Sequence, residues 1–139
     1  IIEYITELDI MLTNAYVAKK YNYCKPTLDK EEDEISFFDA KAMRHPLIEQ
    51  MNTEELYVPN DVSLGKDPKG ILLYGTNAVG KTSLIRAIGI NLTMAQCGMY
   101  VPCSSFNYAP YHTIYTRILG NDNIFKGMST FEVELSVLL

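Results

Sequence analysis

The fold is decided by one short stretch, residues 71–82, which reads Ile71-Leu72-Leu73-Tyr74-Gly75-Thr76-Asn77-Ala78-Val79-Gly80-Lys81-Thr82. It opens with a continuous apolar run, which is typical of a strand buried on both faces. The remainder fits the pattern G-x-x-x-x-G-K-[ST] at every fixed position. Apolar residues at helical spacing come next (Leu84, Ile88, Leu92 and Ala95), and Gly98 is placed to end the helix. The stretch therefore predicts a strand, a loop and a helix over residues 81–97.

The glycine-bounded loop has the chemistry of a polyphosphate site. Glycine at positions 75 and 80 lets successive backbone N–H groups point inward, and the positive end of the following helix adds to the attraction for phosphate. Lys81 would bring a full charge to the β- and γ-phosphates, and the Thr82 hydroxyl would ligate Mg²⁺. We predict that ATP or ADP with Mg²⁺ is bound by Gly75, Thr76, Asn77, Ala78, Val79, Gly80, Lys81, Thr82 and Ser83.

Length and composition indicate one globular domain. The chain has 139 residues and is 47% hydrophobic, which is ample for one core. No apolar run approaches the roughly 20 residues of a membrane-spanning helix, and the N-terminus does not resemble a signal peptide. We expect a soluble intracellular protein that makes no membrane contact. Neither a disulfide framework nor a zinc site is suggested by the cysteines, which we expect to be buried thiols: Cys24, Cys97 and Cys103.

Charge is distributed unevenly. The net charge is −5, with 14 acidic and 8 basic residues before Gly70, and 3 acidic and 4 basic from there on. This is not the basic stripe that neutralises phosphates along a duplex, so the sequence itself gives no positive sign of direct DNA contact. Residue 1 is Ile, and residues 132–139 read as a helix without a cap or breaker, so we expect a piece of a longer chain.

The flanks of the loop predict further elements. Residues 1–20 have the apolar rhythm of an amphipathic helix, and Pro26 with the acidic residues at 29 and 31–34 predicts a solvated loop. Residues 35–42 predict a strand leading to a turn at His45-Pro46, and residues 65–70 predict another turn. Residues 99–103 and 111–119 predict two more strands, and residues 120–128 a loop before the last helix. The alternation is typical of α/β architecture. His45 and His112 have no matched partners, so we expect structural roles.

Several blocks on both sides of the loop resemble, in order, the MutS family of DNA mismatch repair proteins. The resemblance covers nearly the whole chain, and it implies a partial P-loop NTPase domain of the ABC-like ATPase class. Residues 1–26 would be the end of a lever-type helix and residues 27–139 the N-terminal part of the ATPase domain. The blocks are Arg44-His45-Pro46, Tyr57-Val58-Pro59-Asn60-Asp61, the loop, residues 94–103, Tyr115-Thr116-Arg117-Ile118 and residues 127–134.

The resemblance also implies roles for single residues. Tyr57 and Val58 would contact the adenine, with core packing as the alternative, and Asn60 would help to hold their loop. Asn77 would reach the γ-phosphate, so that it and Lys81 are the candidate catalytic residues; the alternative for Asn77 is turn geometry alone. Ser129 begins an S-x-x-E capping box, which suffices to start a helix. In the family this serine faces the nucleotide of the opposite subunit, which implies a contact in trans.

Two departures from the family pattern limit what is implied. The family's commonest loop has Pro-Asn-Met-Gly-Gly before its lysine, whereas residues 76–80 here resemble relatives from large DNA viruses and organelles. The compartment thus stays open between cytoplasm, viral factory, nucleus and mitochondrion. No Asp-Glu pair follows an apolar strand, so the Walker B residues would lie beyond Leu139.

The implied function belongs to the intact protein. It would couple ATP binding and hydrolysis to recognition of mismatched double-stranded DNA, acting as a homo- or heterodimer and contacting DNA through domains absent from this sequence. The chain by itself would bind ATP weakly and show negligible turnover. The alternatives are another ABC-like DNA-maintenance ATPase, although no Leu-Ser-Gly-Gly-type signature is present, and a nucleotide-dependent dimerisation module without turnover.

Overall fold

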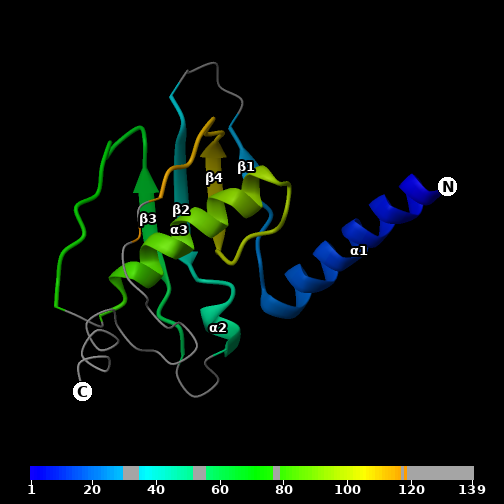
Figure 1. Cartoon of the computed structure of the whole chain (residues 1–139), viewed down its shortest axis with the longest axis horizontal. Helices are drawn as coiled ribbons and strands as arrows, with labels where there is room; N and C mark the ends of the chain where they lie inside the picture. The colour runs from blue at the N-terminus through cyan, green and yellow to red at the C-terminus, as the bar shows by residue number, and fades with distance from the viewer. Residues whose placement is uncertain (30–34, 52–55, 77–78, 117, 119–139) are drawn as a thin grey trace.

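The computed structural model describes residues 1–29, 35–51, 56–76, 79–116 and 118. Figure 1 shows a sheet with one long helix lying across its face, and a second long helix extending away from this body. The chain is therefore a two-layer α/β unit with a projecting helix. The elements in chain order are α1 (Ile2–Tyr21), β1 (Thr27–Leu28), β2 (Phe37–Met43), α2 (Ile48–Met51), β3 (Asn60–Leu64), α3 (Lys81–Gln96) and β4 (Ser105–Ala109).

The sheet has four strands in the order β1-β4-β2-β3. β2 is antiparallel to both of its neighbours, and β1 pairs in parallel with β4. Ala40 lies opposite Phe106 on one side and Val62 on the other, and all three side chains are buried. The expected mixture of helix and strand is confirmed, but the described strands are joined mainly by antiparallel pairing.

The core lies between α3 and one face of the sheet. Phe38 and Phe106 stack in it with their ring centroids 5.9 Å apart and an interplanar angle of 6°. The Tyr108 hydroxyl donates to the carbonyl oxygen of Ala95 at 3.0 Å, which fixes α3 to β4. The predicted apolar stripe of α3 is confirmed, because Leu92 and Ala95 are buried and Leu84 and Ile88 pack against the cluster.

Both long helices were predictable, and each ends at a residue in the left-handed region. α1 is capped by Asn22 at φ 56, and α3 is followed by Gly98 at φ 76. The Met99 N–H donates back to the Met94 carbonyl at 2.9 Å, which satisfies a carbonyl in the last turn of α3. The helix predicted for residues 1–20 is confirmed, but its amphipathic character is not, because large apolar side chains are exposed along its length and Ala18 is its one buried residue in the described structure.

Three further predictions from the flanks are confirmed. The strand predicted over residues 35–42 is β2, displaced by one or two residues, as is usual for strand ends. The turn expected at His45-Pro46 precedes α2. The turn expected over residues 65–70 contains Gly65 at φ 121, whose N–H donates to the Pro68 carbonyl at 2.9 Å.

The strand predicted for residues 71–74 is wrong for this structure. The backbone there adopts no regular secondary structure, and Leu72 and Tyr74 are both 87% exposed. None of the described strands pairs with this segment. An apolar run of high β-propensity forms a strand only where a partner backbone accepts its hydrogen bonds, and propensity alone does not supply that partner.

The two strands predicted after α3 are also wrong. The strand of this region is Ser105–Ala109, and residues 99–103 contribute only an isolated bridge between Val101 and Cys24. Pro102 lacks the N–H that a strand needs, whereas Phe106 and Tyr108 alternate into the core. Residues 111–116 and 118 are not in a strand either, because Pro110 follows β4 and the next side chains lie mostly in solvent.

Three short elements were missed. Thr27–Leu28 forms β1 where a solvated loop was expected, and Ile48–Met51 forms α2 where no helix was predicted. Asn60–Leu64 forms β3 where no strand was predicted. The two strands depend on partners far away in sequence, β4 for β1 and β2 for β3.

Some predictions fall outside the described residues. These are the acidic residues at 31–34, the loop at 120–128, the helix at 132–139, and the candidate site residues Asn77, Ala78 and Ser129.

Candidate functional site

In the structure, the first residues of the glycine-bounded loop are joined by hydrogen bonds to the lysine that follows its last glycine. The Lys81 ammonium donates to the Gly75 carbonyl oxygen at 3.0 Å and also to the carbonyl oxygen of Thr76. Gly80 has φ 87, and a Cβ at this position would meet nothing within 4 Å. The left-handed backbone therefore accounts for the glycine, not a lack of space. The two ends of the loop are thus held close together by the residue that would carry its charge.

The loop opens directly into the N-terminus of α3. Gly80 is the N-cap residue, and among the described residues no side chain caps this end of the helix. The first turn also contains no acidic residue. Thr82 and Ser83 lie in this turn and are half-buried, and Val79 just before it is exposed. The free N–H groups, the helix dipole and the Lys81 ammonium together make a local environment that favours an anion.

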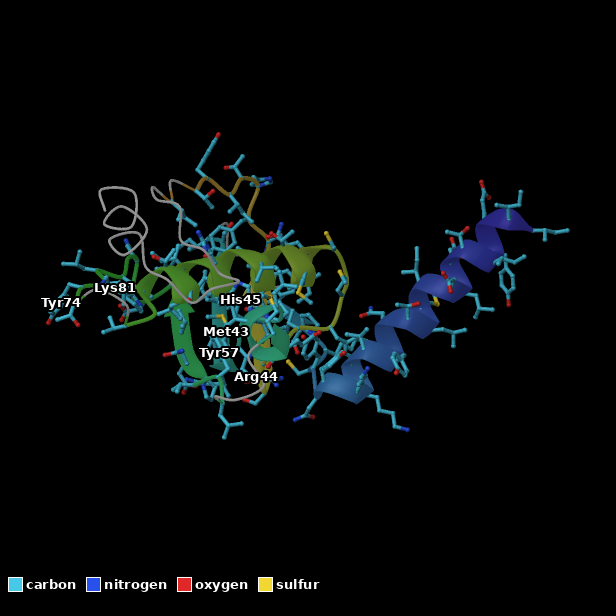
Figure 2. The ribbon with its side chains drawn as sticks, turned by 60° about the horizontal axis from the view of Figure 1, so that its bottom comes forward. Met43, Arg44, His45, Tyr57, Tyr74 and Lys81 are labelled. Atoms are coloured by element: carbon cyan, nitrogen blue, oxygen red, sulfur yellow. The ribbon has the colours of Figure 1, made fainter. Side chains whose placement is uncertain are left out.

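Tyr57, Val58 and Asn60 lie on a separate part of the molecule surface, beside the end of β2. Asn60 pairs with Met43, and its amide Nδ2 donates to the Val58 carbonyl at 3.0 Å, so this side chain holds the segment in place. Tyr57 is half-buried and Val58 is 74% exposed. Figure 2 shows Tyr57 near Met43 and Arg44, with Lys81 at the loop end of α3. Among the described residues, no hydrogen bond joins the two groups.

Arg44 is the most connected side chain next to this segment, and the sequence analysis assigned it no role. Its Nη1 lies 2.9 Å from Oε2 of Glu49 on α2. Its Nη2 donates to the carbonyl oxygens of Tyr21 at 3.3 Å and Asn22 at 2.9 Å, which are at the C-terminal end of α1. Its Cζ lies 5.7 Å from the ring centroid of Tyr23. One guanidinium therefore holds α1 and α2 together.

The backbone of Arg44 is held as firmly as its side chain. Its N–H donates to the Pro102 carbonyl at 2.9 Å, and its own carbonyl accepts from Nδ2 of Asn91 at 3.0 Å. Asn91 is completely buried in α3, and the same Nδ2 also donates to the Ala87 carbonyl at 2.8 Å. A buried amide in the middle of an apolar helix face is the sequence signal that could have pointed to this contact.

Burial raises the pKa values of several side chains around Arg44. Burial raises the pKa of the Glu49 carboxyl, and the nearby Arg44 guanidinium opposes that shift. Burial and the charge of Glu49 raise the pKa of Tyr23 to about 12. Burial, and then the Glu49 charge, also raise the pKa of Tyr57. Glu49 therefore influences Tyr23 next to α1 and Tyr57 next to β3.

His45 has the structural role that was expected. His45 is buried, and its Nδ1 accepts the N–H groups of Leu47 and Ile48, both at 3.3 Å. It thereby caps the start of α2 as an Asn or Asp would. Burial, and then the charge of Arg86, lower the pKa of His45. His112 is exposed.

The cysteines differ in exposure, so the expectation of three buried thiols is wrong in part. Cys103 is buried, Cys24 is intermediate and Cys97 is exposed, and all are free. Cys97 lies at the C-cap of α3, where the helix end faces solvent. Burial raises the pKa of Cys103 to about 12, which keeps this thiol protonated and unreactive.

In the part of the chain that the structure describes, no cluster of three or more His, Cys, Asp or Glu side chains could hold a metal ion. No described helix combines the length and the apolar character needed to cross a membrane.

Comparison with known proteins adds a family context to this geometry. Residues 71–138 match the model of MutS domain V. The chain is 44% identical, over 97% of its length, to the mitochondrial DNA mismatch repair protein mutS homolog of Sarcophyton glaucum, and covers 14% of that protein. It is 36% identical over 99% of its length to a putative DNA mismatch repair protein mutS homolog of Acanthamoeba polyphaga mimivirus, of which it covers 15%.

Bacterial proteins match almost as extensively. The DNA mismatch repair protein MutS of Staphylococcus saprophyticus is 38% identical over 94% of this chain, which covers 14% of it. The chain thus spans about one seventh of the length of these relatives. Relatives of viral and mitochondrial origin are among the matches, in agreement with what the loop at residues 76–80 predicted.

Proposed function

This chain belongs to the MutS family of DNA mismatch repair proteins, and we propose that it supplies half of the nucleotide site through which the intact protein couples ATP binding and hydrolysis to mismatch recognition. The single observation that carries the proposal is the uncapped N-terminus of α3 with the Lys81 ammonium folded over the preceding loop. Its orphan N–H groups and positive charge suit a polyphosphate.

The residues present fit a phosphate chain with its metal. Gly75 and Gly80 leave room for close approach of the backbone, and a Cβ at position 80 would meet no neighbour within 4 Å. On binding, Lys81 would exchange its carbonyl contacts for phosphate oxygens, and the Thr82 hydroxyl would be a ligand for Mg²⁺. The magnesium ion would neutralise charge on the phosphates. We assign the phosphate contacts to the loop, Gly75, Thr76, Asn77, Ala78, Val79 and Gly80, together with Lys81, Thr82 and Ser83.

The base end of the site is assigned to Tyr57 and Val58. The exposed Val58 and the half-buried Tyr57 ring offer a flat apolar surface of the kind on which a purine stacks. Asn60 supports this surface through its bond to the Val58 carbonyl. Because these residues and the loop lie apart in the structure, the nucleotide would span the space between them with its ribose and phosphates.

A dimer completes the proposed mechanism. Ser129 and the helix start that follows it would face the γ-phosphate bound by the opposite subunit, so that ATP occupancy favours the closed dimer. Contact with mismatched DNA is assigned to other parts of the intact protein. Hydrolysis would likewise need an Asp-Glu pair at the end of an apolar strand. This pattern does not occur in the given sequence after the loop, so the chain by itself should turn over ATP negligibly.

The intact protein tests this proposal directly. We expect a duplex that carries a mismatch to change its ATP hydrolysis rate more than a fully paired duplex of otherwise identical sequence does. A Ser129→Ala variant should retain ATP binding but lose ATP-dependent dimer formation in sedimentation experiments. A rate that is indifferent to any DNA would favour a nucleotide-dependent dimerisation module, and stimulation by DNA regardless of mismatch would favour another DNA-maintenance ATPase.

A further inference from the structure

The end of α1 is attached to the rest of the molecule through a small number of polar contacts. Arg44 donates to the last carbonyls of the helix, at Tyr21 and Asn22. Two further contacts lie two turns earlier, where the Asn14 side chain accepts the Tyr100 N–H at 3.2 Å and donates to the Gly98 carbonyl at 3.4 Å. Just after the helix, Cys24 and Val101 exchange two backbone hydrogen bonds of 2.9 Å. The residues before Asn14 project from the body (Figure 1). The Arg44 guanidinium is therefore one of the attachments of the C-terminal end of α1, and it is the one that binds the last carbonyls of the helix.

The strand end next to Arg44 also pairs with the segment that carries the proposed adenine contact. Arg44 directly follows Met43, whose strand partner is Asn60, and Asn60 holds the Val58 carbonyl. Figure 2 labels Tyr57, Met43 and Arg44 in the same region of the molecule. On the opposite side, Glu49 pairs with Arg44 at 2.9 Å, and its charge is felt by Tyr57. Arg44 is thus linked to the Tyr57 segment in two ways, through its ion pair with Glu49 and through the pairing of Met43 with Asn60.

We propose that Arg44 is a positioning residue that ties the base end of the nucleotide site, at Tyr57, to the C-terminal end of α1. The inference rests on the proposed function, because it gives Tyr57 its role in base contact. Arg44 touches neither phosphate nor base in this account. It acts through Glu49 on α2 and through the Met43–Asn60 pairing, and a movement of the α1 end would be felt at the Tyr57 ring.

The planar fork of arginine is the reason that lysine should not substitute fully. Nη1 and Nη2 serve different partners at once, the Glu49 carboxylate on one side and two helix carbonyls on the other. A lysine ammonium keeps the charge but cannot hold both groups in one fixed plane. The Arg44→Lys variant should therefore behave between the wild type and Arg44→Met.

The test separates base affinity from phosphate affinity. Dissociation constants of the intact protein are measured by calorimetry for ATP and for inorganic tripolyphosphate, each with Mg²⁺, in the wild type, Arg44→Met and Arg44→Lys. Lys41→Met is the matched control, because it also removes a positive charge near the end of β2, from an exposed pair with Asp61 at 3.4 Å. Arg44→Met should weaken ATP binding by about tenfold, as expected for a misplaced base-stacking surface.

The expected pattern is that tripolyphosphate affinity stays within about twofold of wild type in every variant, and that Lys41→Met leaves both affinities unchanged. An equal loss for ATP and tripolyphosphate would overturn the inference, since it would mean general damage to the fold. Unchanged ATP affinity in Arg44→Met would overturn it as well. If Arg44→Met does not fold, the ratio of the ATP to the tripolyphosphate dissociation constant is compared between Arg44→Lys and the wild type instead. A wild type that binds neither ligand would overturn the proposed function itself, and the inference with it.

The link to α1 has its own readout. Hydrogen exchange of the amides at Tyr21 and Tyr23 should slow when ATP binds to the wild type, and should be indifferent to ATP in Arg44→Met. Exchange that slows equally in both proteins would show that the α1 end is coupled to the nucleotide by another route, and would overturn the proposal.

Discussion

Lys81 at the start of α3 donates a hydrogen bond to the carbonyl oxygen of Gly75 at 3.0 Å, so the two ends of the glycine-bounded loop are joined by a side chain that carries a full positive charge. The contact brings the Gly75 carbonyl to the uncapped start of a helix. A phosphate chain would find here both a cation and unpaired N–H donors. Four predictions concern the residues around this helix start and the scaffold that holds it.

The first concerns magnesium. Removing Thr82 Oγ1 should take away a metal ligand without touching the phosphate contacts of the backbone. In the Thr82→Ala variant we expect the affinity for ATP with Mg²⁺ to fall by about tenfold. Chelation of Mg²⁺ should weaken binding in the wild type but change little in this variant, and Thr82→Ser should behave as the wild type. Equal sensitivity to chelation in wild type and Thr82→Ala, measured by calorimetry, would contradict the metal assignment.

The second concerns pH and His45. Its Nδ1 must be unprotonated to accept the Leu47 and Ile48 N–H groups, and burial lowers its pKa below the ordinary value of 6.5. Between the lowered folded pKa and the unfolded value, the unfolded chain binds more protons, so stability should fall as pH drops below about 6.5. Urea unfolding from pH 7.5 to 5.5 measures this.

An Asn at this position accepts the same N–H groups and does not titrate. The free energy of unfolding of His45→Asn should therefore lose less on acidification over that range than the wild type does. The same pH dependence in both proteins would assign the acid sensitivity to other groups.

The third concerns Gly65, at φ 121. A Cβ at this position would overlap the Ser36 carbonyl oxygen and lie 2.6 Å from Phe37 Cα. Both are backbone atoms at the start of β2, so they cannot move aside cheaply. Gly65→Ala should lower the free energy of unfolding by roughly 2–4 kcal/mol. Gly70→Ala is the matched control, since its Cβ would meet nothing within 4 Å and should change stability by about 0.5 kcal/mol or less. Similar stability of the two variants in urea titrations would refute the assignment.

The fourth concerns Asn91. Its Nδ2 is the buried donor that serves both the Arg44 and Ala87 carbonyl oxygens. Asn91→Asp would place carboxylate oxygens against two carbonyls, and we expect a loss of about 3 kcal/mol or more at neutral pH. Thr93→Ala removes one exposed bond within the same helix, to the Gly89 carbonyl, and should cost about 0.5 kcal/mol or less. Chemical unfolding of both variants provides the comparison, and a small loss in Asn91→Asp would argue against the buried contact.

What could be predicted from sequence is what depends on local chemistry. Helix α3 is predicted by the spacing of its apolar residues and by Gly98 after its end. Helix α1 ends at Asn22, a residue type that can adopt the left-handed region. The glycine pattern at residues 75–80 could likewise be interpreted locally, because a left-handed Gly80 at the start of a helix depends only on a few neighbouring residues.

What could not be predicted depends on distant partners. Residues 71–74 have the composition of a strand, yet the described strands pair elsewhere. No strand was predicted for Asn60–Leu64, which becomes β3 because β2 is its backbone partner and Val62 is buried in the core. No role was predicted for Arg44 for the same reason, since its partners Tyr21, Glu49 and Asn91 lie on three separate helices.

The measurement that tests the account most directly is a calorimetric titration of the intact protein with ATP and Mg²⁺, comparing the wild type with Lys81→Ala. We predict saturable binding by the wild type and no measurable binding by the variant, with both proteins unfolding at similar temperatures. Equal ATP affinity in the two proteins would contradict the assignment of the phosphates to the Gly75–Lys81 loop.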